Sequence, residues 1–421
     1  MTNLYDESLL VHEAFPQGKI STKVTKPLQT KKDLSLAYSP GVAAPVLKIA
    51  ENPDDAYKYT SKGNLVAVIS NGTAILGLGN KGALASKPVM EGKAALFKRF
   101  AGIDSFDIEI NSTDIDEVAR CVQLLEPTFG GVNLEDIKAP ECFMIERRLI
   151  ETMNIPVFHD DQHGTAVVAS AGLLNALEVA GKDLKKVSIV LNGAGAAGIA
   201  IANMLGELGI EKNQLTLCDS KGPIGDHRTD LNESKMPFSR TMKHRSLADA
   251  LSGADVFIGV SKANCMTPEM LLSMAADPIV FGLANPDPEI EPALARATRK
   301  DLILATGRSD QPNQVNNILC FPFLFRGALD TRARKINTKM KLAAIRAISA
   351  LAKEKVPEDV QKLYAERKLE FGREYVLPVP FDPRLLTKVS VAVAEAAMES
   401  GEAHVKIDLV KYEQSLPERL K

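Results

Sequence analysis

Two short acidic stretches near the middle of the chain contain residues that could do chemistry. The first is Asn133-Leu134-Glu135-Asp136-Ile137, and the second is His159-Asp160-Asp161-Gln162-His163. Four carboxylates in two loops repel one another unless a cation or a positive side chain lies between them. Mg²⁺ and Mn²⁺ prefer oxygen-only ligands of this kind. Because a glycine-rich stretch follows at 193–198, we expect the ion and a redox cofactor to share one cleft, which indicates metal-assisted oxidation of a small acid.

The glycine-rich stretch has the spacing of a dinucleotide-binding turn. It reads Gly193-Ala194-Gly195-Ala196-Ala197-Gly198, between a predicted strand at 187–192 and a predicted helix at 198–208. In such turns the first glycine makes the bend, the second admits the pyrophosphate, and the third allows close helix–strand packing. A second glycine run, 77–82, has no acid at the required distance and is interpreted as a tight turn beside the same cleft.

Asp219 ends the next predicted strand, where an acid would meet the adenine ribose. By itself this acid favours NAD, since it repels a 2′-phosphate. Ser220 and Lys221 follow directly and could hold that phosphate by hydrogen bond and charge. The residues therefore leave both NAD and NADP open.

The elements that must position these residues predict an α/β fold. A doubly wound Rossmann-type domain is expected at 160–317, because short apolar strands alternate there with helices. Residues 1–159 are expected to form a mixed α/β substrate domain, with a polar arm at 1–30. Residues 318–421 should return to that domain as helices at 338–353 and 383–398. A polar tail without a fold of its own is expected from about residue 402.

Single residues outside these motifs are more ambiguous. Tyr38 and Lys93 could act as acid and base, but a half-buried Tyr and a surface Lys are ordinary alternatives, and Lys81, Lys87 and Lys98 compete with Lys93. Asn285 closes a predicted strand and Asn317 follows another. Amides at the carboxyl ends of strands can bind a substrate carboxylate or hydroxyl, although turn formation is their commoner role.

The pair His159 and His163 has the spacing of a helical zinc site. The residue after the first histidine is Asp160, which is too short for the glutamate role of a metalloprotease. Oxygen-only binding by the carboxylates is therefore the preferred interpretation. Solvated loop charge or helix capping is the alternative for all four acids.

Composition narrows the class of protein. The net charge of −2 gives no electrostatic footprint for nucleic acid or a membrane surface. The five cysteines are widely spaced, which favours buried reduced thiols. The first residues have neither a basic start nor an apolar run, and no stretch approaches the length of a membrane helix. A cytoplasmic location is the expectation.

Taken together, these motifs resemble those of malic enzymes over residues 20–400. The resemblance rests on the sequences LAYSPGVAAP, NGTAILGLGNKGALASKPVMEGK, NLEDIKAPECF, HDDQHGTA, NGAGAAG, DSKG, LANPDPE, TGRSDQPNQVNN and FPFLFRGAL. It is strongest with the malic-enzyme portion of bacterial hybrid malic enzymes. Their phosphotransacetylase-like domain has no counterpart before Lys421, so a truncated or a natural short form is expected.

The resemblance implies roles for the candidate residues. These are Tyr38 and Lys93 as catalytic residues, Asp160 as support for Lys93, Glu135, Asp136 and Asp161 as metal ligands, and Asn285 and Asn317 as substrate amides. The implied reaction converts (S)-malate to pyruvate and CO₂ with Mg²⁺ or Mn²⁺. NADP is favoured, because NADP-using members have a similar Asp-Ser-Lys-Gly stretch. A homodimer or higher homo-oligomer is implied.

One departure from the family matters. Larger malic enzymes have an Arg before the ILGLG run to hold a malate carboxylate, and this chain has Asn71-Gly72-Thr73-Ala74 there. Backbone amides near Ser39 and Gly41, or a lysine, are the candidates to replace it. Two rival functions remain: a 2-hydroxy acid dehydrogenase that does not decarboxylate, and a regulatory module that binds nucleotide without catalysis.

Overall fold

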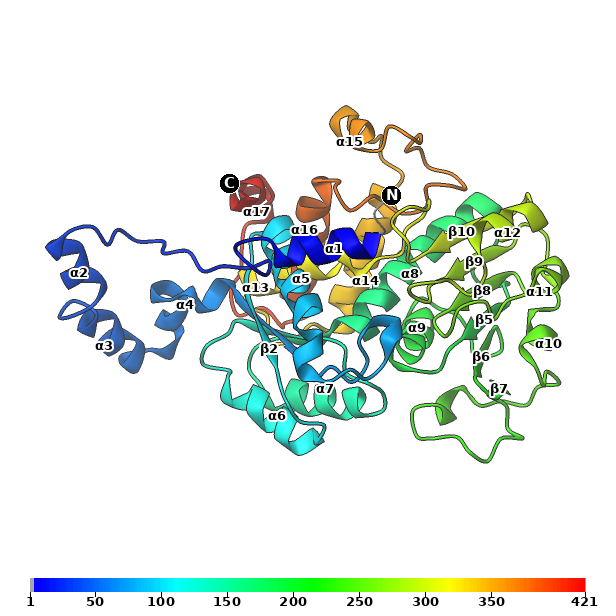
Figure 1. The fold of residues 1–421 in the computed structure, drawn as a ribbon, viewed down its shortest axis with the longest axis horizontal. Coiled ribbons are helices and arrows are strands. Elements are labelled where there is room, and N and C mark those ends of the chain that lie inside the picture. Colours follow the sequence, from blue (N-terminus) through cyan, green and yellow to red (C-terminus); the bar gives the residue numbers. More distant parts are fainter. Residues whose placement is uncertain (1–3, 421) are drawn as a thin grey trace.

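A computed structural model describes residues 4–420 of the chain, which fold around two sheets (Figure 1). The first sheet has four parallel strands in the order β2-β1-β3-β4. Its strands are β1 (Leu65–Ser70), β2 (Asp104–Glu109), β3 (Gly131–Leu134) and β4 (Val157–His159), and its helices are α5 (Ala83–Ala101), α6 (Ile115–Leu124) and α7 (Glu141–Thr152). The central strand β1 is a buried apolar run, as expected for a strand covered on both faces.

The second sheet has the order β10-β9-β8-β5-β6-β7. All its strands are parallel except the short β7 at the edge. They are β5 (Ile189–Asn192), β6 (Leu215–Asp219), β7 (Gly222–Pro223), β8 (Val256–Gly259), β9 (Ile279–Gly282) and β10 (Ile303–Thr306). The strand order reverses between β5 and β8, which creates a crevice at their carboxyl ends. The prediction of a doubly wound α/β fold is confirmed.

Helices flank this second sheet. They are α8 (Asp160–Ala180), α9 (Ala196–Glu207), α10 (Leu247–Leu251), α11 (Pro268–Ser273) and α12 (Pro292–Thr298). Helix α8 follows β4 with no loop between them, whereas the sequence led us to place Asp160 and Asp161 in a loop. Asp160 and Asp161 therefore form the first turn of a helix. The partial positive charge at a helix N-terminus favours acids in this place.

The C-terminal helices pack against both α5 and α8. They are α13 (Phe321–Asp330), α14 (Thr338–Leu351), α15 (Glu358–Leu363) and α16 (Arg384–Glu399). Asn337 caps α14 by accepting from Met340 N–H. Edge-to-face contacts of Phe97 with Phe321 and Phe325, at 4.8 and 5.2 Å between ring centroids, fix α13 on α5.

The expectation of an unfolded polar tail is wrong. Residues 409–420 form α17 (Leu409–Ser415) and a 3₁₀ turn (Leu416–Leu420). Tyr412 and Leu416 are buried, and the Tyr412 hydroxyl donates to the Arg326 carbonyl at 3.3 Å. These two apolar residues, one helical turn apart, are too few to give a periodic signal among charged neighbours.

The N-terminal part of the described chain behaves differently. It contains α1 (Leu4–Glu13), α2 (Lys31–Ala37), α3 (Ala43–Glu51) and α4 (Ala56–Tyr59), and none of residues 4–64 is buried. Figure 1 shows α2 and α3 standing apart from both sheets. The expected arm is thus present and reaches further along the chain than residue 30.

Two further expectations concern composition. All five cysteines are free; Cys142, Cys218 and Cys320 are buried, while Cys121 and Cys265 are half-buried. Between residues 4 and 420, no helix combines the length and apolar character needed to cross a membrane.

Candidate active site

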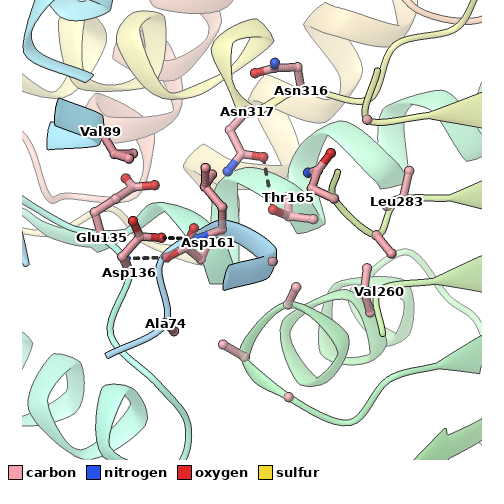
Figure 2. Close-up of a pocket in the computed structure, with 18 of the residues that line it drawn as sticks. Ala74, Val89, Glu135, Asp136, Asp161, Thr165, Val260, Leu283, Asn316 and Asn317 are labelled. Atoms are coloured by element: carbon pink, nitrogen blue, oxygen red, sulfur yellow. Dashed lines mark hydrogen bonds between the residues drawn. The ribbon is translucent and has the colours of Figure 1, made fainter. Parts of the chain in front are cut away.

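A cavity of about 780 Å³ lies between the two sheets. Residues after β1 and β3 and along α5 line one side, and residues after β5, β8 and β9 line the other. Figure 2 shows the acids Glu135, Asp136 and Asp161 on one side of this space, opposite Val260 and Leu283. The cavity therefore joins the acidic stretches to the glycine turn.

Glu135, Asp136 and Asp161 form a compact acidic group. One ligand oxygen from each residue lies within 4.8 Å of the others. Glu135 and Asp136 are 3% exposed and follow β3 directly. The Asp136 backbone N–H donates to Asp161 Oδ2 at 2.7 Å, which ties the loop after β3 to the first turn of α8. Asp136 Oδ2 is buried and has no hydrogen-bond partner.

The electrostatics of this group favour a bound cation. Burial, and then repulsion by Asp161, raises the pKa of Asp136 to about 7. Burial likewise raises the pKa of Glu135 well above its ordinary value, although Lys93 opposes the shift. An unpartnered carboxylate oxygen among like charges is costly unless a positive charge meets it. The oxygen-only set therefore fits a hard divalent cation such as Mg²⁺ or Mn²⁺.

Among the four lysines that the sequence left as candidates, Lys93 is the one that lines the cavity. Its Nζ contacts Asp160 and lies 3.0 Å from Glu135 Oε1. Burial lowers the pKa of Lys93, but attraction to Asp160 and Glu135 outweighs this effect and raises it above the ordinary value. Its competitors Lys81, Lys87 and Lys98 do not line the cavity.

Asp160 is held from two sides. It is fully buried, and Asn317 Nδ2 donates to its Oδ2 at 3.1 Å and to its carbonyl at 3.2 Å. Burial raises the pKa of Asp160, while the nearby Lys93 opposes the rise. Asn317 Oδ1 accepts from Thr165 at 3.0 Å. Asn317 lines the cavity, but its amide is engaged in hydrogen bonds to Asp160 and Thr165.

The glycine turn has the shape that a pyrophosphate requires. A Cβ on Gly198 would lie 1.7 Å from the Gly193 carbonyl, and Gly193 has φ +125°, so neither position accepts a side chain. A Cβ on Gly195 would meet nothing within 4 Å, because Gly195 borders the cavity together with Ala196 and Ala197. The N–H groups at the start of α9 are thus open to an anionic ligand.

Asn285 also reaches the cavity, where it follows β9. Its carbonyl would lie 1.8 Å from a Cβ on Gly77, so the second glycine run touches the dinucleotide sheet across the cleft. This agrees with the interpretation of residues 77–82 as a tight turn beside the cleft. Asp219, Ser220 and Lys221 lie at the end of β6 and do not line the cavity.

The two histidines supply none of the ligand oxygens of the acidic group. His159 is buried and neither of its ring nitrogens has a hydrogen-bond partner, although Nδ1 lies 3.9 Å from Asp161 Oδ2. His163 Nε2 lies 3.0 Å from Glu146. The preference for carboxylates over a zinc pair agrees with this arrangement.

Tyr38 is not brought to the cavity of its own chain. It caps the C-terminal end of α2 and is 69% exposed. Tyr38 does not line the cavity, and Figure 1 shows α2 standing apart from the strands of both sheets.

Two family models cover most of the chain. The model described as malic enzyme, N-terminal domain, matches residues 17–150, and the model described as malic enzyme, NAD binding domain, matches residues 162–368. The chain belongs to the malic enzyme family.

Similar proteins agree with this membership. An NADP-dependent malic enzyme of Rhizobium meliloti (strain 1021) is 56% identical over 98% of this chain and 54% of its own length. An NAD-dependent malic enzyme of the same organism is 54% identical, over 94% of this chain and 52% of its own length. The chain thus spans about half the length of these curated relatives. The crystal structure of malic enzyme from Pyrococcus horikoshii Ot3 superimposes with a TM-score of 0.89 at 41% identity, covering 99% of this chain and 96% of that one.

Sequence reasoning missed several residues in the cavity and around Asp219. Thr165 and Lys138 line the cavity, and Arg228 and Lys235 bind Asp219. Thr165 follows Asp161 by one helical turn, so an earlier start for α8 would have indicated it. Lys138 stands just after the Glu135–Asp136 pair. Arg228 and Lys235 come from an irregular loop that gives no comparable signal.

Proposed function

We propose that this chain catalyses the divalent-metal-dependent oxidative decarboxylation of (S)-malate to pyruvate and CO₂, with reduction of NADP⁺. One observation carries the proposal: a single cavity brings together the Glu135–Asp136–Asp161 group, the Lys93–Asp160 pair and the glycine turn. Membership of the malic enzyme family supports it. These three parts are what oxidation of a hydroxy acid and stabilisation of the resulting carbanion need.

The acids and Lys93 divide the chemistry between them. A Mg²⁺ or Mn²⁺ on Glu135, Asp136 and Asp161 would supply Lewis-acid stabilisation of negative charge on substrate oxygens. Its positive charge would also offset the negative charge of the nearby acids, which raises the pKa of Lys93 and keeps its amine protonated. Lys93 then takes the proton of the C2 hydroxyl, while Asp160 orients its amine. The glycine turn holds the dinucleotide so that hydride leaves C2 for the nicotinamide. After loss of CO₂, Tyr38 returns a proton to C3.

Substrate binding is assigned to the polar residues of the same cavity. Asn285 and Asn317 are proposed to meet the malate hydroxyl and a carboxylate. Lys93 and Lys138 are the cationic side chains lining the cavity in the described chain. Lys138 is therefore our candidate for the carboxylate that larger family members bind with Arg.

The substrate domain is proposed to comprise residues 1–159 and 318–421, with the dinucleotide domain at 160–317.

NADP is proposed over NAD. The Rhizobium meliloti relative with the higher identity is named as NADP-dependent, and cations surround Asp219 at the end of β6. We also propose a cytoplasmic location, which the five free thiols support.

We further propose a homodimer in which Tyr38 serves the cavity of the partner. The part of the N-terminal arm at residues 21–51 has exposed apolar side chains and no buried residue. These include Val24, Leu28, Leu34, Leu36, Val46 and Leu47, each more than half exposed. Helices as short as α2 and α3 are marginal alone, and apolar patches of this kind mark interfaces. A second copy is the proposed occupant, because Tyr38 belongs to this arm and is absent from its own cavity.

An absorbance assay tests the activity. The protein is incubated with (S)-malate and NADP⁺, with and without Mn²⁺, while NADPH and released CO₂ are measured. We expect equal amounts of both products with Mn²⁺, and neither in excess chelator. NADPH without CO₂ would identify a 2-hydroxy acid dehydrogenase instead. Nucleotide binding without any turnover in the presence of Mn²⁺ would identify a regulatory module.

A further inference from the structure

The first turn of α8 has no side-chain cap of its own. The helix begins after His159, whose side chain makes no capping hydrogen bond, and the first N–H groups of a helix have no partner within it. This turn nevertheless carries Asp160, which contacts Lys93, and Asp161 of the acidic group. Because no loop separates the turn from β4, a shift of the turn would move both carboxylates together. A contact from outside the helix is needed to hold it.

Glu146 of α7 supplies this contact. Its Oε1 accepts from the His159 backbone N–H at 3.0 Å, and its Oε2 accepts from Gln162 Nε2 at 3.2 Å. His163 Nε2 lies 3.0 Å from both oxygens, and the Glu146 side chain is buried. In a capping box the third helical residue accepts from the N–H of the N-cap residue. Here that residue is Gln162, and Glu146 accepts from the N–H in its place.

The contacts continue through His163 to the C-terminal helices. Lys341 Nζ, on α14, lies 3.4 Å from His163 Nδ1. A lysine ammonium only donates and a carboxylate only accepts, so a neutral imidazole with its proton on Nε2 satisfies both neighbours. The chain Lys341–His163–Glu146 therefore joins α14, α8 and α7. None of these three residues lines the cavity, so they can act on the chemistry only through the residues that do.

We propose that Glu146 is a positioning residue for the metal site: by fixing the first turn of α8, it sets the direction of the Asp160 and Asp161 carboxylates. The inference rests on the proposed metal-dependent function and adds a residue to it that lies outside the cavity. The alternative is that Glu146 only stabilises the packing of α7 on α8. The two interpretations differ for Mn²⁺ binding, because a general loss of stability leaves the arrangement of the acids in the folded protein unchanged.

Calorimetric titration with Mn²⁺ tests the proposal without turnover, and the melting temperature in chelator is measured beside it. Loss of a group that orients metal ligands typically costs about 10–100-fold in affinity. Glu146→Leu removes all three hydrogen bonds and should raise the Kd for Mn²⁺ by up to about 100-fold. Glu146→Gln keeps one acceptor oxygen but turns its NH₂ group toward other donors, and should raise the Kd about tenfold.

Asn175→Ala is the matched control. Asn175 is also a buried side chain of α8, but its amide donates to the Ser349 and Val376 carbonyls, at 3.0 and 2.8 Å, away from the acids. This variant should lower the melting temperature and leave the Kd for Mn²⁺ unchanged. If it raises the Kd as much as Glu146→Gln does, any loosening of α8 is sufficient and the proposal is wrong.

Lys341→Met separates positioning from a simple effect of charge. If Glu146 acted only through its negative charge, its loss would weaken cation binding through space, and loss of a nearby positive charge would strengthen it. Under the proposal Lys341→Met binds Mn²⁺ no more tightly than the intact protein, because His163 loses the donor that fixes its ring. Tighter binding by Lys341→Met would overturn the proposal.

The remaining outcomes are also decisive. If Glu146→Gln binds Mn²⁺ with the Kd of the intact protein, the positioning role is excluded while the metal site stands. If Glu146→Leu does not fold, Glu146→Gln decides the question, because it keeps the volume of the side chain. If the intact protein binds no Mn²⁺, the proposed metal-dependent function fails, and the inference fails with it.

Discussion

At the scale of single residues, the backbone holds the acids together. The Asp136 N–H bond to Asp161, and the Leu76 N–H bond to Asp136 at 3.4 Å, set the carboxylates close together although they repel one another. Asp136 itself has a positive φ of 54°, which few side chains adopt at low cost. The fold thus holds these carboxylates in an arrangement in which they repel one another, and a bound cation would offset that repulsion.

Neutralising one acid should therefore stabilise the metal-free protein. We expect Asp136→Asn to raise the melting temperature in chelator, because it removes a buried like charge. The intact protein should gain about 2.7 kcal/mol when Mn²⁺ reaches one hundred times its Kd, and the variant should lose this gain. Differential scanning fluorimetry with and without Mn²⁺ measures both effects. Asp359→Asn, 94% exposed on α15, is the control. An unchanged Mn²⁺ response in Asp136→Asn would exclude Asp136 as a ligand.

The residues that sequence identified and those that it missed differ in kind. The roles of Gly193, Gly195 and Gly198 could be predicted from the sequence because steric limits fix their spacing within one turn. Arg228 and Lys235 were not readable, because they reach Asp219 from an irregular loop whose path depends on tertiary packing. The roles of Ser220 and Lys221 were inferred from adjacency in sequence, which does not determine which side chain points at a ligand.

At the scale of elements, most strands and the long C-terminal helices were predictable, whereas the start of α8 and the presence of α17 were not. The buried strands of the second sheet are short apolar runs bounded by turn residues, so their places were evident. The start of α8 was hidden because Asp160 and Asp161 are read as loop residues unless the helix dipole is considered. Helix α17 and the 3₁₀ turn after it were hidden because few of their residues are buried: Tyr412 in the helix and Leu416 in the turn.

The packing of this C-terminal segment can be tested directly. Leu416→Ala removes a fully buried side chain and should cost about 2–5 kcal/mol of unfolding free energy. Val410→Ala, 66% exposed on α17, should change stability little. Chemical denaturation of both variants measures the difference. Because neither residue lines the cavity, turnover at low temperature should stay near that of the intact protein. Equal stability of the two variants would show that α17 is not docked.

At the scale of the whole molecule, the proposed dimer places the parts of one site on two chains. Tyr38→Phe and Lys93→Ala should each be inactive alone. When the two variants are unfolded together and refolded, each mixed dimer should contain one site with both native residues. A random mixture should then recover about one quarter of the native activity, since a twofold interface exchanges the same arm in both directions.

Recovery is measured by the NADPH assay, with each variant refolded alone as the control. No recovery, from a mixture proven to contain mixed dimers, would place Tyr38 and Lys93 in the site of the same chain. The sequence could not decide this point, because the spacing of residues within a chain carries no information about which copy completes a cavity.

The direct passage from β4 into α8 limits the insertions and deletions that the site can tolerate at this junction. With no connecting loop, the direction of Asp161 is set by the angular phase of a helix that begins one residue earlier. A single inserted residue between His159 and Asp161 would turn that carboxylate by about 100° about the helix axis. A chimaera that joins the chain before β4 to the chain after α8 of a relative should therefore be active only if the number of residues between β4 and Asp161 is unchanged.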